Sequence, residues 1–263
     1  MINPEFLTKC FNIGLAASLV LSAPAVAWGP QGHRVAGTLT EPYLSPIAKQ
    51  AVRSLLGDES LAQASTWADR MRDNPSPFWQ DTAGPYHYVT VPSGKTYGEV
   101  GAPGKGDSVT ALAEFRATLE DPNASRVHRQ LALRFSLHII QDLHQPMHVG
   151  NGLDRGGNSI KLTLNGKSTN LHRVWDSSIL AVAGRSDGQW VGELSAISNE
   201  QLSTWEAADP LVWIGESAAL RDQVYPEQRR IDSEYLVYWL PSAERRLQQS
   251  AVRAAAWLNE VFE

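Results

Sequence analysis

Cysteine is almost missing from this chain, and its scarcity limits the chemistry open to the protein. The 263 residues contain one cysteine, Cys10, so the chain cannot form an internal disulfide bond or a zinc site built from several thiolates. Any metal must be held by His, Asp and Glu, which suit a hard or borderline cation. Charged residues make up only 19% of the chain, with a net charge of -5. Lys and Arg are scattered, with no basic stripe of the kind that grips duplex DNA.

Long hydrophobic runs are also missing, since none approaches the roughly 18 apolar residues that span a bilayer. Residues 11–23 are apolar, follow Lys9 and precede Ala25-Val26-Ala27, which is the pattern of a signal peptide with a small-residue cleavage site. We therefore predict that residues 1–27 are removed by a cut between Ala27 and Trp28; the alternative is a buried N-terminal helix. The mature protein would be periplasmic or secreted, without stable membrane insertion.

The remaining chain is predicted to be mainly α. No internal repeat or linker interrupts it, so residues 28–263 are expected to form one domain. Ser45 and Pro46 begin a helix that Gly57 ends. Other helices are expected near residues 67–72, 108–119, 126–145, 172–183 and 242–261, and residues 73–107 should form a long loop region. Alternating apolar residues around Asn165-Gly166 predict one small β-hairpin over residues 159–171.

Two pairs of His and Asp point to a metal site. His138 and Asp142 are four residues apart on a predicted helix, so both side chains leave the same face, and His172 and Asp176 repeat this spacing. His148 follows shortly after Asp142, where the chain turns back. Imidazole and carboxylate together suit zinc without any cysteine. Each pair alone could equally be a solvated ion pair on a helix surface.

Short motifs spread over residues 28–176 give the chain a resemblance to a known family. They are Trp28-Gly29-Pro30-Gln31-Gly32-His33, Trp67-Ala68-Asp69-Arg70-Met71-Arg72, Tyr86-His87-Tyr88, the stretch from His138 through Asp142 and Pro146 to His148, Gly156-Gly157-Asn158, and Asn170-Leu171-His172-Arg173-Val174-Trp175-Asp176. In these motifs and their order the chain resembles the S1/P1 nucleases. The resemblance implies a helical phospholipase C/P1 nuclease-like fold and a zinc-dependent endonuclease that hydrolyses single-stranded DNA and RNA.

The resemblance also implies three zinc ions per chain, whose ligands map onto this sequence. One zinc would be held by Asp69, His87, His138 and Asp142; a second by His33, Asp142 and the amine and carbonyl oxygen of Trp28; and a third by His148, His172 and Asp176. The amine of Trp28 is free only after cleavage. The third zinc would have three protein ligands and an open position, as catalytic zinc sites do.

Further roles follow from the same resemblance. Asp69 would orient the attacking water, and Arg72 would neutralise charge on the phosphate oxygens, giving products with 5′-phosphates. Tyr88 would stack on a base, and Asn151 and Asn158 would contact the substrate. The alternatives are a surface ion pair for Arg72, a core position for Tyr88 and simple turn roles for the two asparagines.

Two other functions stay open at this point. A zinc phospholipase C uses a very similar cluster, but has glutamate where this chain has Asp176, so a phospholipid substrate is possible. A periplasmic zinc-binding protein would need only saturated coordination and no Arg72. The favoured substrates are single-stranded nucleic acid and nucleotides, including those cleaved by a 3′-nucleotidase, and we expect a monomer.

Overall fold

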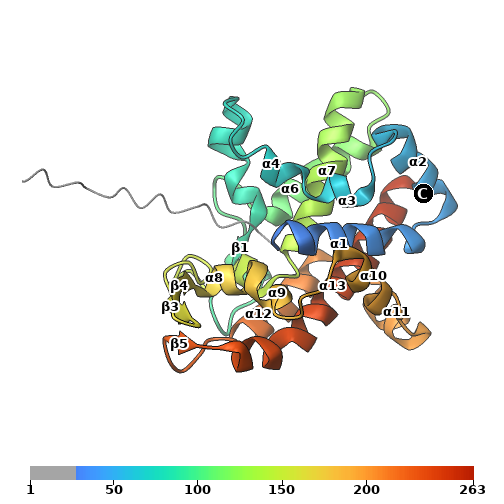
Figure 1. The fold of residues 1–263 in the computed structure, drawn as a ribbon. Coiled ribbons are helices and arrows are strands. Elements are labelled where there is room, and N and C mark those ends of the chain that lie inside the picture. The colour runs from blue at the N-terminus through green and yellow to red at the C-terminus, as the bar shows by residue number, and fades with distance from the viewer. Residues whose placement is uncertain (1–27) are drawn as a thin grey trace, which may run out of the picture.

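A computed structural model describes residues 28–263, and this part of the chain is mainly helical, as predicted (Figure 1). The predicted signal peptide and Cys10 lie outside the described residues. No helix within residues 28–263 combines the length and the apolar character needed to cross a bilayer.

The elements follow one another with short connections. The α-helices are α1 (Pro30–Thr40), α2 (Pro46–Leu56), α3 (Leu61–Ser65), α4 (Trp67–Arg70), α5 (Tyr97–Val100), α6 (Ser108–Glu120), α7 (Arg126–Asp142), α8 (Leu171–Arg173), α9 (Ile179–Ala181), α10 (Asp187–Leu194), α11 (Asn199–Trp205), α12 (Pro210–Arg221) and α13 (Ser233–Phe262). Short 3-10 helices are η1 (Glu41–Tyr43), η3 (Gly84–His87) and η4 (Pro146–His148), and π-helical turns are η2 (Phe78–Thr82) and η5 (Val174–Ser178). The strands are β1 (Val89–Thr90), β2 (Val149–Gly150), β3 (Lys161–Leu164), β4 (Lys167–Asn170) and β5 (Arg230–Ile231).

Several helix ends lie where the local sequence places them. The Ser45 side chain accepts a hydrogen bond from the Ala48 amide at the start of α2, and Gly57 ends that helix with φ +64°. The last helix, in contrast, begins nine residues earlier than predicted, because α13 continues through Pro241. Its first turns are retained because Asp232 caps them and Leu236 is buried in the core, so packing outweighs the hydrogen bond lost at proline.

The predicted hairpin is present, and it belongs to a larger sheet than expected. Strands β3 and β4 pair antiparallel around Asn165 and Gly166, whose φ values of +48° and +80° match a type I′ turn. Strand β5 adds to the free edge of β3 in parallel, giving the order β4-β3-β5. A second sheet consists of β1 and β2, which pair in parallel with Val89 opposite Val149. Two-residue strands carry too little alternation to be predicted from sequence.

The buried side chains form two hydrophobic clusters, and α13 contributes to both. The first contains Phe135 and Ile139 of α7 together with Val89 and Val149. The second contains residues of α1, α8 and α9, such as Val35, together with Trp28 and Trp175. Helix α1 crosses the middle of the molecule, with α4, α6 and α7 on one side and α8, α9 and α12 on the other (Figure 1). The seam between the two clusters therefore runs between α1, α7 and η5.

Candidate metal centre

Nearly all of the histidines along this seam lie in groups that could hold a metal ion. Within each of three groups, the potential ligand atoms lie within 4.8 Å of one another. The groups are His33, His138 and Asp142; Asp69, His87 and His138; and His148, His172 and Asp176. The structure thus brings together all eight of the His and Asp side chains that the sequence nominated as zinc ligands.

Asp142 lies at the junction of the groups. Its Oδ1 is 3.4 Å from Nε2 of His33, and its Oδ2 is 3.1 Å from Nδ1 of His87 and 3.2 Å from Nε2 of His138. The carboxylate is fully buried. One oxygen therefore faces His33 of α1 and the other faces His87 of η3 and His138 of α7, which is the arrangement that a carboxylate bridging two metal ions requires.

Helix α7 and the small parallel sheet set these positions. His138 and Asp142 leave the same face of α7 because they are four residues apart. His148 directly precedes β2 and His87 lies two residues before β1, so the pairing of these strands brings the two histidines together. Nδ1 of His148 donates to the His87 carbonyl oxygen over 2.6 Å, which links two segments that are 61 residues apart.

The third group is built on a π-helical turn. His172 lies in α8 and Asp176 lies in the π-helical turn η5, so the helix is wider between these two residues. Nε2 of His172 is 3.4 Å from Oδ2 of Asp176. Such turns recur at functional sites. The Gly29 amide donates to the Asp176 carbonyl oxygen over 2.6 Å, which ties the segment at Trp28 to this group. Trp28 itself is completely buried; the ligand role of its amine stays a prediction.

Four imidazoles are held with Nδ1 turned away from the cluster. Nδ1 of His138, His148 and His172 lies 2.6–2.7 Å from a backbone carbonyl oxygen, of Ser65, His87 and Gly156 respectively, and Nδ1 of His33 lies 2.6 Å from Oε1 of Gln141. A carbonyl oxygen only accepts, so Nδ1 carries the proton and Nε2 keeps its lone pair. Metal-binding histidines are oriented in this way. His87 differs, because its Nδ1 faces His138 and Asp142.

The backbone at Gly156 supports His172 through a close approach to its neighbours. Its φ is +59°, and a Cβ at this position would lie 2.3 Å from the Met147 carbonyl oxygen. Only glycine allows this backbone to come close enough for its carbonyl to accept the proton of His172. The Gly156-Gly157-Asn158 motif therefore acts on the third group through the backbone.

Several polar atoms of the cluster lack hydrogen-bond partners within the described residues, although they are buried. They include Nε2 of His33, Nε2 of His148 and Oδ1 of Asp142. Burying an unpaired polar atom is costly, by about 1–3 kcal/mol. A cation bound among these atoms would satisfy them together, and the mixture of imidazole nitrogen and carboxylate oxygen fits zinc. The residues present therefore fit the metal that the sequence implied.

Burial controls the protonation of the cluster. It lowers the pKa of His87 to about 4 and that of His172 to about 3, so both rings are neutral at pH 7 and can donate a lone pair. Burial acts to raise the pKa of Asp142, but His138 and His148 outweigh it and hold the carboxyl well below its ordinary pKa. Burial raises the pKa of Asp176 well above its ordinary value, and the hydrogen bond from Gln145 offsets only part of this rise.

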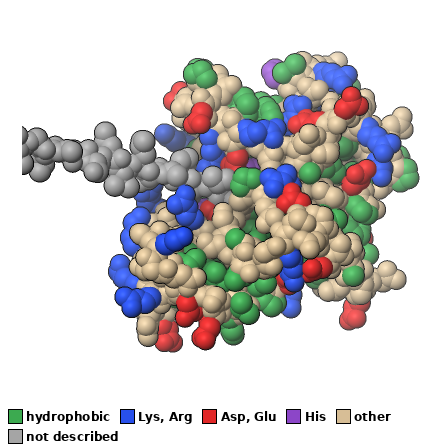
Figure 2. Space-filling model, viewed as in Figure 1, with side chains coloured by type: hydrophobic (Ala, Val, Ile, Leu, Met, Phe, Trp, Pro, Cys, Tyr) green, Lys and Arg blue, Asp and Glu red, His purple; other side chains and the backbone are tan. Residues whose placement is uncertain are grey.

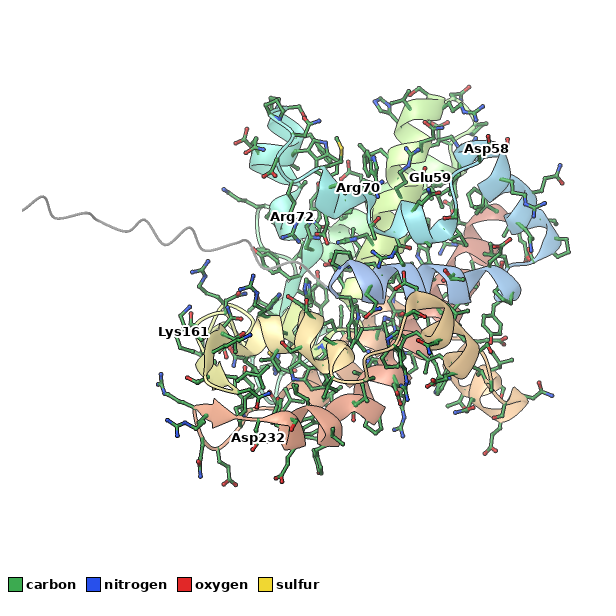
Figure 3. The ribbon with its side chains drawn as sticks, viewed as in Figure 1. Asp58, Glu59, Arg70, Arg72, Lys161 and Asp232 are labelled. Carbon is green, nitrogen blue, oxygen red and sulfur yellow. The ribbon has the colours of Figure 1, made fainter. Side chains whose placement is uncertain are left out.

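A cavity of about 510 Å³ opens over the cluster. His87, His148 and His172 contribute to its wall, together with Arg72 and Tyr88. Nη2 of Arg72 lies 2.9 Å from Oδ1 of Asp69, so this guanidinium is placed beside the metal groups; Arg72 is labelled in Figure 3. The Tyr88 side chain is exposed, so it is available to a ligand and is not a core residue.

The two asparagines nominated from the sequence differ in position. Asn158 lines the cavity, while its side-chain amide donates to the Arg155 carbonyl oxygen. The amide of Asn151 donates to Asp154 and to the hydroxyl of Tyr225, and its oxygen accepts from the Leu153 amide. These contacts make Asn151 part of the support for the loop that carries Gly156.

Two glutamines with structural roles at the site were not predicted. Gln141 connects Nδ1 of His33 to the hydroxyl of Ser65, and Nε2 of Gln145 donates to Oδ1 of Asp176 over 2.6 Å. Both are fully buried. Their signal in the sequence was weak but present, because each is an uncharged polar residue within three positions of proposed ligands.

Comparison with known proteins agrees with this geometry. A family model described as S1/P1 nuclease matches residues 28–263. Endonuclease 2 of Arabidopsis thaliana is 29% identical over 93% of this chain and 94% of its own length. Nuclease S1 of Aspergillus oryzae is 28% identical over 93% of this chain and 95% of its own length, and nuclease P1 of Penicillium citrinum is 30% identical over 57% of both chains.

Proposed function

This chain belongs to the S1/P1 nuclease family, which makes it a phosphodiester hydrolase, and from that premise we propose that it is an exported, zinc-dependent endonuclease for single-stranded DNA and RNA. Its products would end in 5′-phosphates, and a 3′-nucleotidase activity would accompany the main reaction. The observation that carries the proposal is the convergence of three His/Asp groups beside a cavity with an exposed tyrosine.

The proposed centre holds three zinc ions. Asp69, His87, His138 and Asp142 would bind one, His33 and Asp142 with the amine and carbonyl oxygen of Trp28 a second, and His148, His172 and Asp176 a third. Bound zinc would supply Lewis acidity and lower the pKa of a coordinated water. Neutral His87 and His172 and ionised Asp142 are already in the state that binding requires, whereas Asp176, whose pKa burial raises, would release its proton on binding.

Arg72 and Asp69 are the proposed catalytic side chains. The guanidinium of Arg72 lies at the cavity wall, within 2.9 Å of Asp69. From this position it would stabilise the charge that develops on the phosphate oxygens. The Asp69 carboxylate would accept a hydrogen bond from the attacking water and so orient it. Both residues come from one short stretch at the end of α4, which keeps their separation fixed.

The preference for single strands follows from the position of the centre. A phosphate must reach buried groups through the cavity, and a flexible strand does this more easily than a stiff duplex. The exposed ring of Tyr88 would stack on a neighbouring base, which contributes about 1–3 kcal/mol regardless of the base. Asn158, which also lines the cavity, would contact the substrate, whereas Asn151 would act by holding the loop.

The proposal also covers the export, the domain organisation and the oligomeric state of the protein. Residues 1–27 would act as a signal peptide, and the mature protein would be periplasmic or secreted. Residues 28–263 would form one nuclease domain, which agrees with the span of the family match. The protein would act as a monomer.

The test uses zinc-loaded protein that begins at Trp28. A 20-nucleotide single strand, as DNA and as RNA, is compared with the same DNA as a duplex and with phosphatidylcholine vesicles. We expect both single strands to be cut faster than the duplex, with 5′-phosphate ends, and the lipid to be hydrolysed slowly or not at all. Equal cleavage of the duplex, or turnover of the lipid alone, would reject the proposal.

A further inference from the structure

Basic side chains that are scattered in the sequence come together on the β4-β3-β5 sheet. From Arg155 to Trp175 the chain has four Lys or Arg residues and no Asp or Glu. The sheet adds two more from a segment about sixty residues away. Together they form a set that we call the hairpin surface: Arg155, Lys161, Lys167, Arg173, Arg229 and Arg230, all exposed.

Strand register places Lys161 and Arg230 on one face of the sheet, whereas Lys167, which is paired with Leu164 beside the turn, stands at the end of the hairpin on the other face. Leu162 and Ile231 are buried, so their neighbours Lys161 and Arg230 point outward. Thr163, two residues after Lys161 and on the same face, is paired with Arg230. Neighbouring strands lie about 4.8 Å apart and alternate residues about 7 Å apart. The charges on β3 and β5 are therefore close enough to act on one bound polyanion, within the Debye length of about 8 Å.

The hairpin surface is continuous with the cavity over the metal centre. Arg155 and Asn158 line that cavity. Nζ of Lys161 donates to the Asn158 carbonyl oxygen over 3.3 Å, and Lys161 is paired across the hairpin with Asn170, which caps the turn that contains Arg173. Lys and Arg gather on the side of the molecule that carries β3, β4 and β5 (Figure 2), and Lys161 lies on the same side as Arg72 (Figure 3).

We propose that the hairpin surface binds the phosphates of a single-stranded polynucleotide that extends beyond the cleaved bond. This inference rests on the proposed nuclease function and adds where the rest of the strand lies. A protein with a net charge of -5 repels a polyanion at long range, so a local basic surface beside the cavity decides the side on which a strand approaches. The surface ends at β5, because Asp232 and Glu234 follow it at the start of α13; Asp232 is labelled in Figure 3.

The test compares long and short substrates. The triple variant Lys161→Gln, Arg173→Gln and Arg230→Gln removes three exposed charges and none of the proposed catalytic or metal-binding groups. Its matched control is Lys49→Gln, Arg53→Gln and Arg116→Gln, which removes three exposed charges on α2 and α6. For each protein, kcat/KM is measured on a dinucleoside monophosphate and on a 20-nucleotide single strand over a range of salt concentrations.

We expect the triple variant to cleave the dinucleotide within about twofold of the wild type, because that substrate does not reach the surface. On the 20-nucleotide strand its kcat/KM should fall about tenfold at low salt, and the slope of log kcat/KM against log salt should become shallower by about 2, since each phosphate contact on a single strand contributes about 0.7. The control variant should match the wild type on both substrates.

Three results would overturn the inference. One is an unchanged salt slope on the long strand. Another is an equal loss of kcat/KM on the dinucleotide, with Arg230→Gln alone as a milder variant to confirm it. The third is loss of binding to phosphatidylglycerol vesicles with normal cleavage of the long strand, which would assign the surface to an anionic membrane. If the wild type cleaves neither the dinucleotide nor the 20-nucleotide strand, that result contradicts the proposed nuclease function and not the binding role of the hairpin surface.

Discussion

Two buried clusters of charged and polar side chains lie near each other in this molecule, and they are built in opposite ways. One is the metal centre. The other, here called the arginine cluster, consists of Glu216, Arg246 and Arg253 with the surrounding His144, Ser217 and Gln249, and it joins α12, α13 and the end of α7. The first is rich in lone pairs, and the second is rich in N–H donors.

The arginine cluster is closed. Arg246 donates to Glu216, Gln249, Ser217 and two backbone carbonyl oxygens, and Arg253 donates to both oxygens of Glu216 as well as to His144 and the Trp205 carbonyl oxygen. Burial lowers the pKa of Arg246 to about 10, and Glu216 opposes this shift. Arg246 therefore stays charged at neutral pH, and Glu216 pairs with both arginines.

The metal centre is open. Atoms of His33, Asp142 and His148 are buried without a hydrogen-bond partner in the described part of the chain. Its nearest strong cation, Arg72, lies at the edge of the centre, beside Asp69. The comparison teaches that burial and charge alone do not mark a functional site. A cluster with all its donors and acceptors matched stabilises the fold, whereas a cluster with converging unmatched lone pairs is prepared for a cation.

The largest effect should come from removing a ligand of the open cluster. His148→Ala should lower kcat/KM on single-stranded DNA by about 10³-fold, because it removes several kcal/mol of transition-state stabilisation, while the circular dichroism spectrum keeps its helical form. His128→Ala, an exposed histidine at the start of α7, is the control and should be fully active. Full activity of His148→Ala would refute a role in the third group.

A mutation in the arginine cluster should lower the stability of the protein and leave catalysis nearly unchanged. Arg253→Met breaks the pair with the partly exposed Glu216 and removes the donor to the Trp205 carbonyl oxygen; it should lower the free energy of unfolding by about 1–3 kcal/mol, with kcat/KM of the folded protein nearly unchanged. The control Arg116→Met removes exposed pairs with Glu120 and Glu260 and should cost less than about 1 kcal/mol. Denaturant unfolding measures both. A stable Arg253→Met protein that has lost its zinc would reverse the assignment of the two clusters.

The smallest effect tests the support around the open cluster. Gln141→Leu removes the acceptor of the His33 ring and should weaken zinc binding by about 10–100-fold, measured by competition with a chelator. Gln130→Leu on the same helix, whose amide donates to the Leu55 carbonyl oxygen, is the matched control and should bind zinc normally. Unchanged affinity in Gln141→Leu would show that the ring needs no such support.

The sequence predicted which His and Asp side chains converge in the open cluster and almost nothing of the closed one; their role as ligands stays a prediction. Helical spacing placed His138 with Asp142, and the motifs added His33 and Asp69. The helical class and the hairpin at Asn165-Gly166 were predicted from the same kind of local signal, and the structure confirms both. Local signals are sufficient there because the residues that interact are only a few positions apart in the sequence.

What could not be predicted depends on contacts between distant segments. The pairing of Thr163 with Arg230 creates the hairpin surface, and the packing of α12 against α13 creates the arginine cluster. The predicted start of the last helix at residue 242 was wrong, because α13 continues through Pro241 and burial of Leu236 stabilises its earlier turns. None of these contacts leaves a periodic pattern in the sequence.

The most direct test measures zinc content and single-strand cleavage on one preparation of protein that begins at Trp28. We predict three zinc ions per chain, loss of cleavage when a chelator removes them and recovery when zinc is restored. The same chain with residues retained before Trp28 should bind less zinc and cleave more slowly. Undiminished cleavage by the metal-free protein would contradict the account.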